Sequence, residues 1–514
     1  MALPQLNRTL IKEKKYNQIS SLHVPPQIQL KYPEKILQFG SGALLRGFLD
    51  FFVDQAHRKN LFDGSVVVVN STRSGRGAAF NEQDGLFTLR IEGFSKGKTV
   101  KEYIVNGAIS RAISAADAWN QVLACAKNPA LVAITSNTTE VGITLKEDDD
   151  LKADPPQSFP GKLTAFLYER FKAFNGSEDH GLVILPTELI LDNGSKLKQI
   201  VRTLAERNGL EAGFTDWLES ANIFCNTLVD RIVPGTPDEA KQQSIFDELG
   251  FTDDLLTVSE VYRLFAIEGD KELLHKKVPF LRADENIIIR EDITPYRERK
   301  LRILNGGHTI SVAAGFLRGL KTVYDCMQDE VMEQFVTKVI HNEIVPSLDI
   351  DQAMAKAFAD DVLDRFRNPF LNHALLSITL QYTSKMNMRN APTFARYAKK
   401  FGKVPDLMCA GFAAYLLFAR PQKVSEGKYY GIYEGKEYLV NDEQAGYLMH
   451  LWTEVDQKDY KQVEILVHKL LAEENLWDIR LNEIEGLADR ISQYLHEFIQ
   501  SGVKGTLSRA VAEE

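Results

Sequence analysis

Residues 300–309, KLRILNGGHT, place a lysine, an asparagine and a histidine around two adjacent glycines. Hydride transfer between an alcohol and a nicotinamide cofactor needs a group that takes the hydroxyl proton and donors that stabilise alkoxide character. A lysine serves when burial or a neighbouring positive charge lowers the pKa of its ammonium group from about 10.4. We interpret Lys300 as a candidate acid/base, Asn305 as an amide donor to the reacting oxygen, and His308 as a second donor on the same helical face.

The glycines Gly306 and Gly307 are unexpected in a segment that otherwise predicts the start of a helix. Each glycine costs roughly 1 kcal/mol relative to alanine in a helix interior. Two explanations would compensate for this cost: the glycines allow close packing against another helix, or they leave room for a flat ligand beside the polar side chains. A lysine, an asparagine and a histidine on a helix are by themselves also typical of a surface, so the rest of the chain must indicate a cofactor.

A glycine turn near the N-terminus supplies that indication. The β-favouring run 35–39 leads directly into GSGALLRG, residues 40–47. Two glycines there permit a tight turn and let the backbone approach a pyrophosphate at the start of the following helix. The third glycine of the usual fingerprint is replaced by Leu45, with Gly47 two residues later. A structural turn is the alternative, but the strand–turn–helix–strand context predicts a dinucleotide site at Phe39, Gly40, Gly42, Ala43 and Leu44.

Polar side chains follow two further strand candidates, where a doubly wound fold binds its ligand. Residues 65–69 end in Asn70, where an acidic residue would favour NAD by bonding the ribose 2′-hydroxyl. Asn70 can still bond a hydroxyl, while Arg73 and Arg76 are either contacts for the 2′-phosphate of NADP or solvated loop charges. NAD and NADP therefore both remain open from these residues. After residues 131–135, the polar residues predicted to line the cofactor site, or else to form a polar turn, are Ser136, Asn137 and Thr138.

The pattern of apolar residues changes near residue 295. Before it, short continuous apolar runs alternate with helical patterns, as in a parallel sheet buried on both faces. After it, apolar residues recur at helical spacing. The sequence predicts an α/β Rossmann-like N-terminal domain, residues 1–294, and a mainly α-helical C-terminal domain, residues 295–514. Strands are expected at 35–39, 65–69, 131–135, 181–185 and 223–229, and helices at 163–174, 196–206, 327–345, 353–366, 371–382, 408–419 and 463–471.

Composition restricts the class of protein. The 514 residues carry 61 Lys+Arg against 70 Asp+Glu, a net charge of −9, which gives no overall basic field for nucleic acid or an anionic membrane. The four cysteines are widely separated and form no CxxC pair, which argues against disulfides and a zinc site. The longest apolar run, 408–419, is shorter than a membrane span. We expect a cytoplasmic protein that acts on a small molecule; its oligomeric state is not predicted.

The spacing Lys-x4-Asn-x2-His resembles the active-site signature of the polyol-specific long-chain dehydrogenases, the mannitol dehydrogenase family. The GSGALLRG turn, LVDRIVP at 228–234 and RFRNP at 365–369 also resemble that family, so the resemblance spans nearly the whole chain. It implies a Rossmann-like and a helical domain, NAD as cofactor, and catalysis without a metal. The roles that it implies are general acid/base for Lys300, oxyanion site for Asn305, substrate orientation for His308, and pocket lining for Asp230 and Lys385.

Several stretches, among them SNTTEVGI and PTELILDNG, resemble family members that interconvert a ketohexonate and a hexonate. Polyol-oxidising members carry Cys-Asp-Asn where this chain has Thr187-Glu188-Leu189. A second oxyanion asparagine is therefore absent, and either Asn193 replaces it or other donors act with Asn305. Mannitol oxidation or another ketohexonate stays open, as do a dinucleotide-sensing protein without turnover and a purely structural protein.

A hexonate carries a carboxylate, so its pocket needs a cation. Two candidates, Lys385 and Arg389, lie four residues apart on one predicted helical face, although an exposed basic stripe would look the same. The neighbouring pair Asp230 and Arg231 could position a polar group and an anion, or form an ordinary ion pair. The predicted substrate-binding residues are Asp230, Arg231, His373, Lys385 and Arg389.

Overall fold

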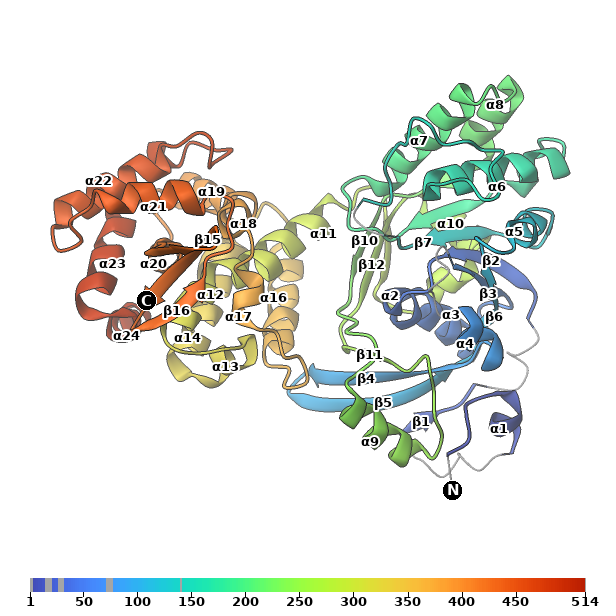
Figure 1. Ribbon diagram of the computed structural model, residues 1–514, viewed down its shortest axis with the longest axis horizontal. Helices are drawn as coiled ribbons and strands as arrows, with labels where there is room; N and C mark the ends of the chain where they lie inside the picture. The colour runs from blue at the N-terminus through green and yellow to red at the C-terminus, as the bar shows by residue number, and fades with distance from the viewer. Residues whose placement is uncertain (1–2, 14–20, 26–31, 71–76, 139–140, 514) are drawn as a thin grey trace. The chain divides into compact units, whose positions relative to one another are not determined.

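The computed structural model describes residues 3–13, 21–25, 32–70, 77–138 and 141–513 (Figure 1). The chain forms two compact units: the first comprises Met1–Glu92 and Thr99–Ile293, and the second Gly93–Lys98 and Thr294–Glu514. The short segment Gly93–Lys98 belongs to the second unit, although in the sequence it lies between the two stretches of the first unit. Within that unit the backbone N–H of Lys96 donates to the carboxylate of Asp364 at 2.8 Å.

A parallel sheet forms the centre of the first unit. Its described strands run in the order β6-β3-β2-β7-β8-β9, and each neighbouring pair is parallel. All residues of β3, β7 and β8 are buried, which confirms the prediction from continuously apolar runs and the α/β fold class. The strands are β2 (Glu34–Phe39), β3 (Ser65–Asn70), β6 (Ile109–Ser114), β7 (Ala133–Ser136), β8 (Val183–Pro186) and β9 (Ile223–Phe224).

The order of these strands marks where a ligand is expected. If the six strands are numbered 1 to 6 in chain order, from β2 to β9, their order across the sheet is 3-2-1-4-5-6. This is the strand order of a Rossmann fold. The chain reverses its direction of winding between β2 and β7. At that point Phe39 pairs with Ser136, and the N–H of Asn137 donates to the carbonyl of Phe39 at 3.1 Å. The carboxyl ends of β2 and β7 are therefore the topological switch point.

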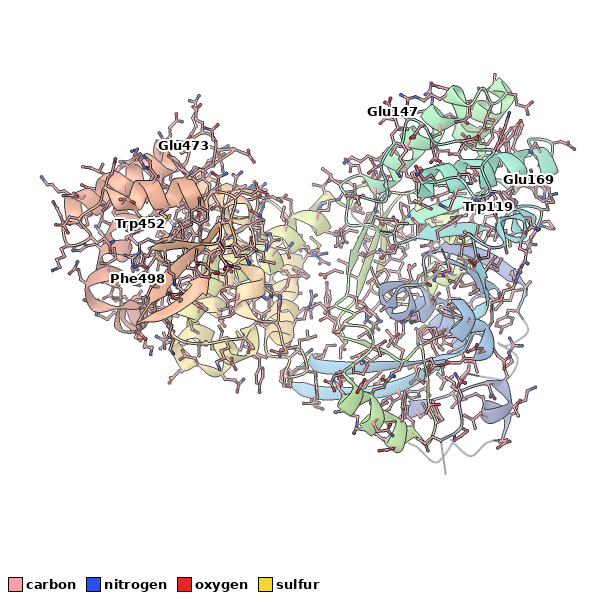
Figure 2. All side chains as sticks on the ribbon, viewed as in Figure 1. Trp119, Glu147, Glu169, Trp452, Glu473 and Phe498 are labelled. Atoms are coloured by element: carbon pink, nitrogen blue, oxygen red, sulfur yellow. The ribbon has the colours of Figure 1, made fainter. Side chains whose placement is uncertain are left out.

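Two apolar layers cover the sheet. Side chains alternate along the strands, so Val66 and Val68 join the layer under Phe48 and Phe52, while Val67 joins the layer with Phe166. Trp119, labelled in Figure 2, is buried in the second layer. The helices of this unit are α1 (Arg8–Lys12), α2 (Ala43–Gly47), α3 (Leu49–Arg58), α4 (Gly77–Glu82), α5 (Trp119–Cys125), α6 (Phe159–Ala173), α7 (Asn193–Arg207), α8 (Ala212–Ala221), α9 (Glu239–Leu249) and α10 (Lys271–Lys277).

The predicted strand at residues 223–229 is wrong, because the structure divides it between two sheets. β9 ends at Phe224, and β10 (Thr227–Asp230) pairs with β12 (Leu264–Glu268) in a sheet of order β10-β12-β13. At the start of β10 the N–H of Thr227 donates to the side chain of Asn193. The remaining strands of this unit are β13 (Ile287–Arg290) and, in the order β1-β5-β4-β11, β1 (Leu22–His23), β4 (Phe87–Ser95), β5 (Lys98–Asn106) and β11 (Thr257–Ser259).

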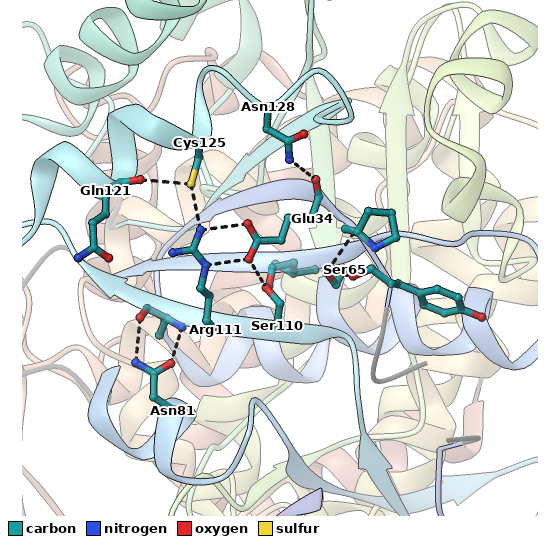
Figure 3. Close-up of polar contacts among 12 residues, drawn as sticks. Glu34, Ser65, Asn81, Ser110, Arg111, Gln121, Cys125 and Asn128 are labelled. Carbon is teal, nitrogen blue, oxygen red and sulfur yellow. Dashed lines mark hydrogen bonds and ion pairs between the residues drawn. The ribbon is translucent and has the colours of Figure 1, made fainter. Parts of the chain in front are cut away.

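A polar cluster joins the amino ends of the parallel strands, at the edge opposite the switch point (Figure 3). Glu34 at the start of β2 accepts hydrogen bonds from Arg111 of β6 at 2.7 and 3.0 Å and from Ser110 at 3.1 Å. Arg111 also lies 3.7 Å from the sulfur of Cys125. Because β3 separates β2 from β6 in the sheet, the Glu34–Arg111 pair spans three strands and lowers the pKa of the Glu34 carboxyl. We interpret this cluster as structural.

The second unit is mainly helical, as predicted. Trp452 and Phe498 (Figure 2) are buried among its helices, and every residue of α20 after Asp406 is buried. Its helices are α11 (Thr294–Arg299), η4 (Lys300–Gly306), α12 (Gly307–Leu317), α13 (Val323–Gln328), α14 (Glu330–Lys338), η5 (Val339–Ile344), α15 (Val345–Ser347), α16 (Gln352–Phe366), α17 (Leu375–Ile378), α18 (Tyr382–Arg389), α19 (Ala391–Phe401), α20 (Asp406–Phe418), α21 (Ala445–Thr453), α22 (Tyr460–Leu471), α23 (Leu487–Ser501) and α24 (Val503–Glu513).

Two features of this unit differ from the sequence prediction. Of the helix expected at 371–382, the structure forms α17, and α18 begins only at its last residue, because Gln381 adopts a left-handed backbone conformation with φ of 52°. A small antiparallel sheet of order β14-β15-β16 was not predicted; it consists of β14 (Lys423–Ser425), β15 (Lys428–Tyr433) and β16 (Lys436–Leu439). Within the described ranges of the chain, every helix is too short or too polar to cross a lipid bilayer.

Candidate active site

The glycine turn after β2 lies at the switch point and has the backbone that a dinucleotide turn requires. Gly40 has φ of 127°, a region that L side chains rarely adopt, and its N–H donates to the carbonyl of Val69. A side chain at Gly40 would approach the carbonyl oxygen of Asn137 to 2.8 Å. At Gly42, by contrast, a Cβ would meet nothing within 4 Å. The turn is thus closed on its strand side and open beyond Gly42, as a cradle for a phosphate-linked ligand would be.

The two residues that depart from the usual fingerprint have packing roles. The side chain of Leu45 lies against Gly40, at 3.1 Å from where a Cβ would be. Gly47 faces Val233, and a Cβ there would come within 2.9 Å of that side chain. Gly47 therefore provides the close packing that the third glycine of the fingerprint normally gives. It also ends α2, which with Ala43 and Leu44 is only five residues long before the chain continues as α3.

The loop after β7, Ser136 to Thr138, is held from the end of β8. The Ser136 hydroxyl donates to Glu188 at 3.0 Å, and Thr138 donates to the same carboxylate from its N–H and its hydroxyl, both at 3.0 Å. The Asn137 amide donates to the carbonyl and the hydroxyl oxygen of Thr187, both at 3.1 Å. Burial raises the pKa of the Glu188 carboxyl, while these hydrogen bonds lower it. Sequence reasoning singled out the loop but missed the role of Glu188.

Asn70 lies where the predicted ribose contact should be. It ends β3, is 5% exposed, and its side-chain oxygen accepts a hydrogen bond from the Ser41 hydroxyl at 3.0 Å. The side chain of Asn70 thus faces the residue between Gly40 and Gly42. The alternative contacts for a 2′-phosphate, Arg73 and Arg76, lie outside the described residues.

Arg231 does not have the environment of an anion-binding residue. Its guanidinium group donates to the carbonyl of Gly47 at 2.6 Å and to the carbonyl of Glu260 at 2.9 and 3.1 Å, and lies over the Phe51 ring. Burial, followed by the charge of Arg263, lowers the pKa of Arg231 to about 9. These contacts indicate that Arg231 holds the segment after α2 in place. Its neighbour Asp230 is also buried, at the end of β10.

Asn193 cannot replace the missing oxyanion asparagine in this conformation. Its amide nitrogen donates to the carbonyls of Pro186 and Glu188 and to the Thr227 hydroxyl, at 3.1 to 3.2 Å. Its oxygen accepts from the N–H groups of Gly194 and Thr227. The side chain is fully buried, so both ends of the amide serve the fold.

The Lys-Asn-His segment forms a π-helix, η4, which joins α11 to α12. Hydrogen bonds in a π-helix connect residues five apart, so Lys300 and Asn305 lie about one turn apart. In an α-helix the same spacing would separate them by roughly 140° around the axis. Lys300, Asn305 and His308 are all half-buried. Single π-helical turns inside α-helices occur frequently at functional sites.

The glycine pair is explained by close packing against neighbouring segments. A Cβ at Gly307 would lie 3.1 and 3.2 Å from carbon atoms of Ile340, which belongs to the second π-helix, η5. A Cβ at Gly306 would lie 3.4 Å from the amide nitrogen of Asn390, which donates to the Gly306 carbonyl at 3.1 Å. Of the two explanations that the sequence left open, the contacts support helix packing.

His308 is held between aromatic rings in a basic environment. Its imidazole stacks on Phe366 with ring centres 4.0 Å apart and meets His373 edge to face at 5.1 Å. Burial lowers the pKa of His308 well below its usual range, and the charges of His373, Arg365 and Arg389 lower it further. The imidazole is therefore neutral at neutral pH, and it can donate or accept a hydrogen bond.

The predicted cations of α18 lie in the same basic environment. Lys385 donates to the carbonyl of Ile378 at 2.9 Å, and burial and then the charge of Arg389 lower its pKa. Arg389 donates to the Thr309 hydroxyl at 3.0 Å, and its buried Nε has no partner among the residues that the structure describes. Burial and the charge of Lys385 lower the pKa of His373. The structure thus brings together His308, His373, Lys385 and Arg389 in one unit.

Arg302 connects the π-helix to the helix that carries these cations. It is buried, donates to the backbone carbonyls of Met388 and Arg389 at 2.5 and 3.0 Å, and is paired with Glu298 at 3.3 Å. It lies two residues after Lys300, so its hydrogen bonds fix the end of α18 relative to η4. Sequence reasoning missed Arg302, because a lone arginine in a helical pattern carries no positional signal. Among the described residues, no group of three or more His, Cys, Asp or Glu side chains is placed to hold a metal ion.

Both units match known family models. Residues 34–278 match the Mannitol dehydrogenase Rossmann domain, and residues 292–499 match the Mannitol dehydrogenase C-terminal domain. A Rossmann unit followed by a helical unit of this kind defines a two-domain dehydrogenase. The chain belongs to the mannitol dehydrogenase family.

Similar proteins include family members that are named for one particular activity. The chain is 41% identical to altronate oxidoreductase of Bacillus subtilis (strain 168) over 480 residues, which cover 93% of this chain and 95% of that protein. It is 37% identical to altronate oxidoreductase of Yersinia enterocolitica, with 93% of this chain and 97% of that protein covered.

Solved structures show the same fold. A D-sorbitol dehydrogenase in substrate-free form has a TM-score of 0.77 at 22% identity, covering 98% of this chain and all of that chain. The Pseudomonas fluorescens mannitol 2-dehydrogenase in ternary complex with NAD and D-mannitol has a TM-score of 0.67 at 21% identity, covering 99% of this chain and all of that chain.

Proposed function

We propose that this chain is an NAD(H)-dependent altronate oxidoreductase that interconverts D-altronate and D-tagaturonate. Two curated relatives with that name, at 37 and 41% identity, cover nearly the whole chain and support the choice of substrate. The observation that carries the proposal is the basic cluster beside the Lys-Asn-His segment. The carboxylate of a sugar acid needs a cation in its pocket, which a neutral polyol does not.

Lys300 is the general acid/base in this proposal. In altronate oxidation its amine takes the proton of the reacting hydroxyl, and in tagaturonate reduction the ammonium group returns that proton. The amide nitrogen of Asn305 donates to the same oxygen and stabilises its alkoxide character. Among the described residues the Asn305 side chain has no hydrogen-bond partner, which leaves its amide available for this role. When bound, NAD+ accepts the hydride of the substrate carbon.

His308 positions the substrate rather than exchanging its proton with solvent. Because its pKa is held well below the usual range, the ring stays neutral and acts as a hydrogen-bond donor to a substrate hydroxyl. Stacking on Phe366 fixes the plane of the ring. A fixed, neutral donor discriminates between hydroxyl configurations without adding a charge that competes with Lys300.

The carboxylate of the sugar acid binds at Lys385 and Arg389, with His373 at the edge of the same cluster. Both cations are half-buried, and burial strengthens their attraction for an anion. The Nε of Arg389 has no partner among the described residues, and it supplies a donor that a carboxylate oxygen would satisfy. Burial and mutual repulsion lower the pKa of Lys385, and a bound carboxylate would relieve that repulsion.

The first unit binds the dinucleotide in this proposal. Gly40 and Gly42, with Phe39, Ala43 and Leu44, form the turn for the pyrophosphate. Asn70 bonds a ribose hydroxyl, and the Ser136–Thr138 loop forms the neighbouring wall. The geometry fits a dinucleotide, because the turn is open beyond Gly42 and lies at the switch point of the sheet. Arg231 is left out of the binding role, because its guanidinium group donates to backbone carbonyls.

The test is to follow loss of NADH absorbance with tagaturonate, fructuronate and fructose supplied separately, and then with NADPH. Strong preference for tagaturonate and NADH is the expected result. Equal reduction of fructuronate would be consistent with the family and the carboxylate site, but it would refute tagaturonate as the specific substrate. Equal reduction of fructose would refute the carboxylate site. NADH binding without turnover of any ketohexonate would instead indicate a dinucleotide-sensing protein.

A further inference from the structure

The side chains of the loop after β7 donate their hydrogen bonds to the protein, so they can only accept hydrogen bonds from a ligand. Both oxygens of the Glu188 carboxylate accept from the loop: Oε2 from the Ser136 hydroxyl, and Oε1 from the N–H and hydroxyl of Thr138. Glu188 itself is 3% exposed. An ionised carboxylate only accepts hydrogen bonds, and each hydroxyl has a single hydrogen to donate. The hydroxyls of Ser136 and Thr138 therefore point their hydrogens at Glu188. Thr138 is half-buried and leaves only lone pairs for a ligand, whereas Ser136 is 1% exposed and supports the loop from beneath.

Asn137, between Ser136 and Thr138, also offers only an acceptor to a ligand. The amide of Asn137 lies 3.1 Å from both the carbonyl oxygen and the hydroxyl oxygen of Thr187. The Thr187 hydroxyl donates its own hydrogen to the carbonyl of Ser136 at 2.7 Å, so it accepts from Asn137. The nitrogen end of the Asn137 amide must face Thr187, and its carbonyl oxygen remains for a ligand.

We propose that Glu188 and Thr187 are positioning residues that make the Ser136–Thr138 loop an acceptor-only wall, which binds hydrogen-bond donors of the cofactor and rejects its phosphates. This inference rests on the proposed function, because it assumes that a nicotinamide dinucleotide binds beside the loop. The cofactor has three kinds of donor: its ribose hydroxyls, the NH2 group of its carboxamide and the 6-amino group of its adenine. Phosphate oxygens are acceptors and anionic, so lone pairs on the loop repel them.

Two substitutions test the wall in the full-length protein. Thr138→Val keeps the shape of the side chain and removes its acceptor oxygen. Glu188→Gln keeps the acceptor for Thr138 and places an amide nitrogen at Ser136, which turns the Ser136 hydroxyl away. Each is expected to raise the Kd for NADH roughly tenfold, as loss of about one hydrogen bond would. The KM for the sugar acid at saturating cofactor is expected to stay within about twofold.

Asp253→Asn is the matched control. Asp253 is a fully buried carboxylate in the same unit that accepts from the Gln83 amide and the Leu255 N–H, both at 2.8 Å. Its pKa is also raised by burial. If Glu188 acts only through stability, Asp253→Asn should affect NADH binding equally at a matched loss of unfolding temperature. The proposal expects NADH affinity to change only in the loop variants.

ADP-ribose separates the carboxamide from the other donors, because it keeps the ribose hydroxyls and the adenine amino group and lacks the carboxamide. Weakened binding of both NADH and ADP-ribose to the Thr138→Val protein would assign the wall to the ribose hydroxyls or the adenine amino group. Weakened binding of NADH alone would assign it to the carboxamide. Unchanged NADH affinity in both loop variants would overturn the inference, even with normal altronate oxidation by the unmodified protein. Absence of NADH binding to the unmodified protein would overturn the proposed function instead.

Discussion

The imidazole ring of His308 lies almost parallel to the phenyl ring of Phe366, with 12° between the planes and 4.0 Å between the centres. His308 is in the first turn of α12 and Phe366 is the last residue of α16. The stack therefore joins two helices that are distant in sequence and sets the direction of the two ring nitrogens. His373 closes the edge of the same ring.

Phe366→Leu should weaken the control of that ring while keeping an apolar contact. We expect the KM for altronate to rise several-fold and the Kd for NADH to stay unchanged, because the substitution affects only the substrate contact. The stability loss should be about 1 kcal/mol, since the volume change is small. Steady-state kinetics and denaturant unfolding check both values. A variant with unchanged KM would show that the stack has only a packing role.

Lys300→Met should remove turnover and leave cofactor binding intact. General acid–base groups contribute about a hundredfold or more to rate, and methionine keeps most of the apolar stem. Lys356→Met, on the exposed face of α16, is the matched control and should keep full activity. NADH binding is measured by fluorescence titration. Substantial turnover in the Lys300 variant would require another proton acceptor.

Lys385→Met should distinguish charged from neutral substrates. Hydrogen bonds to charged groups contribute about 1.5–3 kcal/mol, so the KM for altronate should rise tenfold or more. Any slow activity on fructose or mannitol should change little, because these substrates lack a carboxylate. The comparison of the two substrates within one variant separates charge recognition from general damage. An equal loss on both would place Lys385 outside the carboxylate site.

The sequence predicted the sheet well because its strands are buried on both faces. Continuous apolar runs such as 65–69 have no other stable environment, and the glycine turn gave the position of the switch point. The break of 223–229 was hidden because it depends on Asn193, more than thirty residues earlier in the chain. The break at Gln381 was hidden too, since helical periodicity continues across it.

For the candidate site, residue types and spacing were sufficient to find Lys300, Asn305 and His308 but not the π-helix that places them. The apolar pattern of η4 is compatible with an α-helix, and the Gly306–Asn390 contact that accompanies the wider turn is not visible in sequence. The contacts of Arg231 were hidden for a related reason: its partners are backbone carbonyls, which no side-chain pattern reveals.

Gly307→Ala tests the packing explanation for the glycine pair. Alanine gains roughly 1 kcal/mol in helix propensity, but its Cβ would press on Ile340 at 3.1 Å, and overpacking costs about 1–3 kcal/mol. We expect a small net loss in the free energy of unfolding. Combining it with Ile340→Val, which removes the nearest carbon, should restore stability beyond the sum of the single changes. Additive single effects would mean that the two side chains do not compete for space.

Asp50 gives a pH dependence with a defined sign. It is fully buried in α3, and burial raises the pKa of its carboxyl to about 7, partly offset by the Gln38 amide and the charge of Arg46. The folded state therefore holds this proton more tightly than the unfolded chain, where the pKa is about 3.9. Its contribution to stability is complete below about pH 4 and is lost as pH rises through about 7.

Asp50→Asn removes that titration while keeping the side chain's volume. The difference between a pKa of about 7 and one of about 3.9 corresponds to roughly 4 kcal/mol across this pH window. We therefore expect the free energy of unfolding of the variant, relative to the unmodified protein, to rise between pH 5 and pH 8. Denaturant titrations at several pH values measure this difference, and other titrating groups cancel because both proteins contain them. A constant difference would show that Asp50 ionises normally in the folded state, with its charge compensated by Arg46.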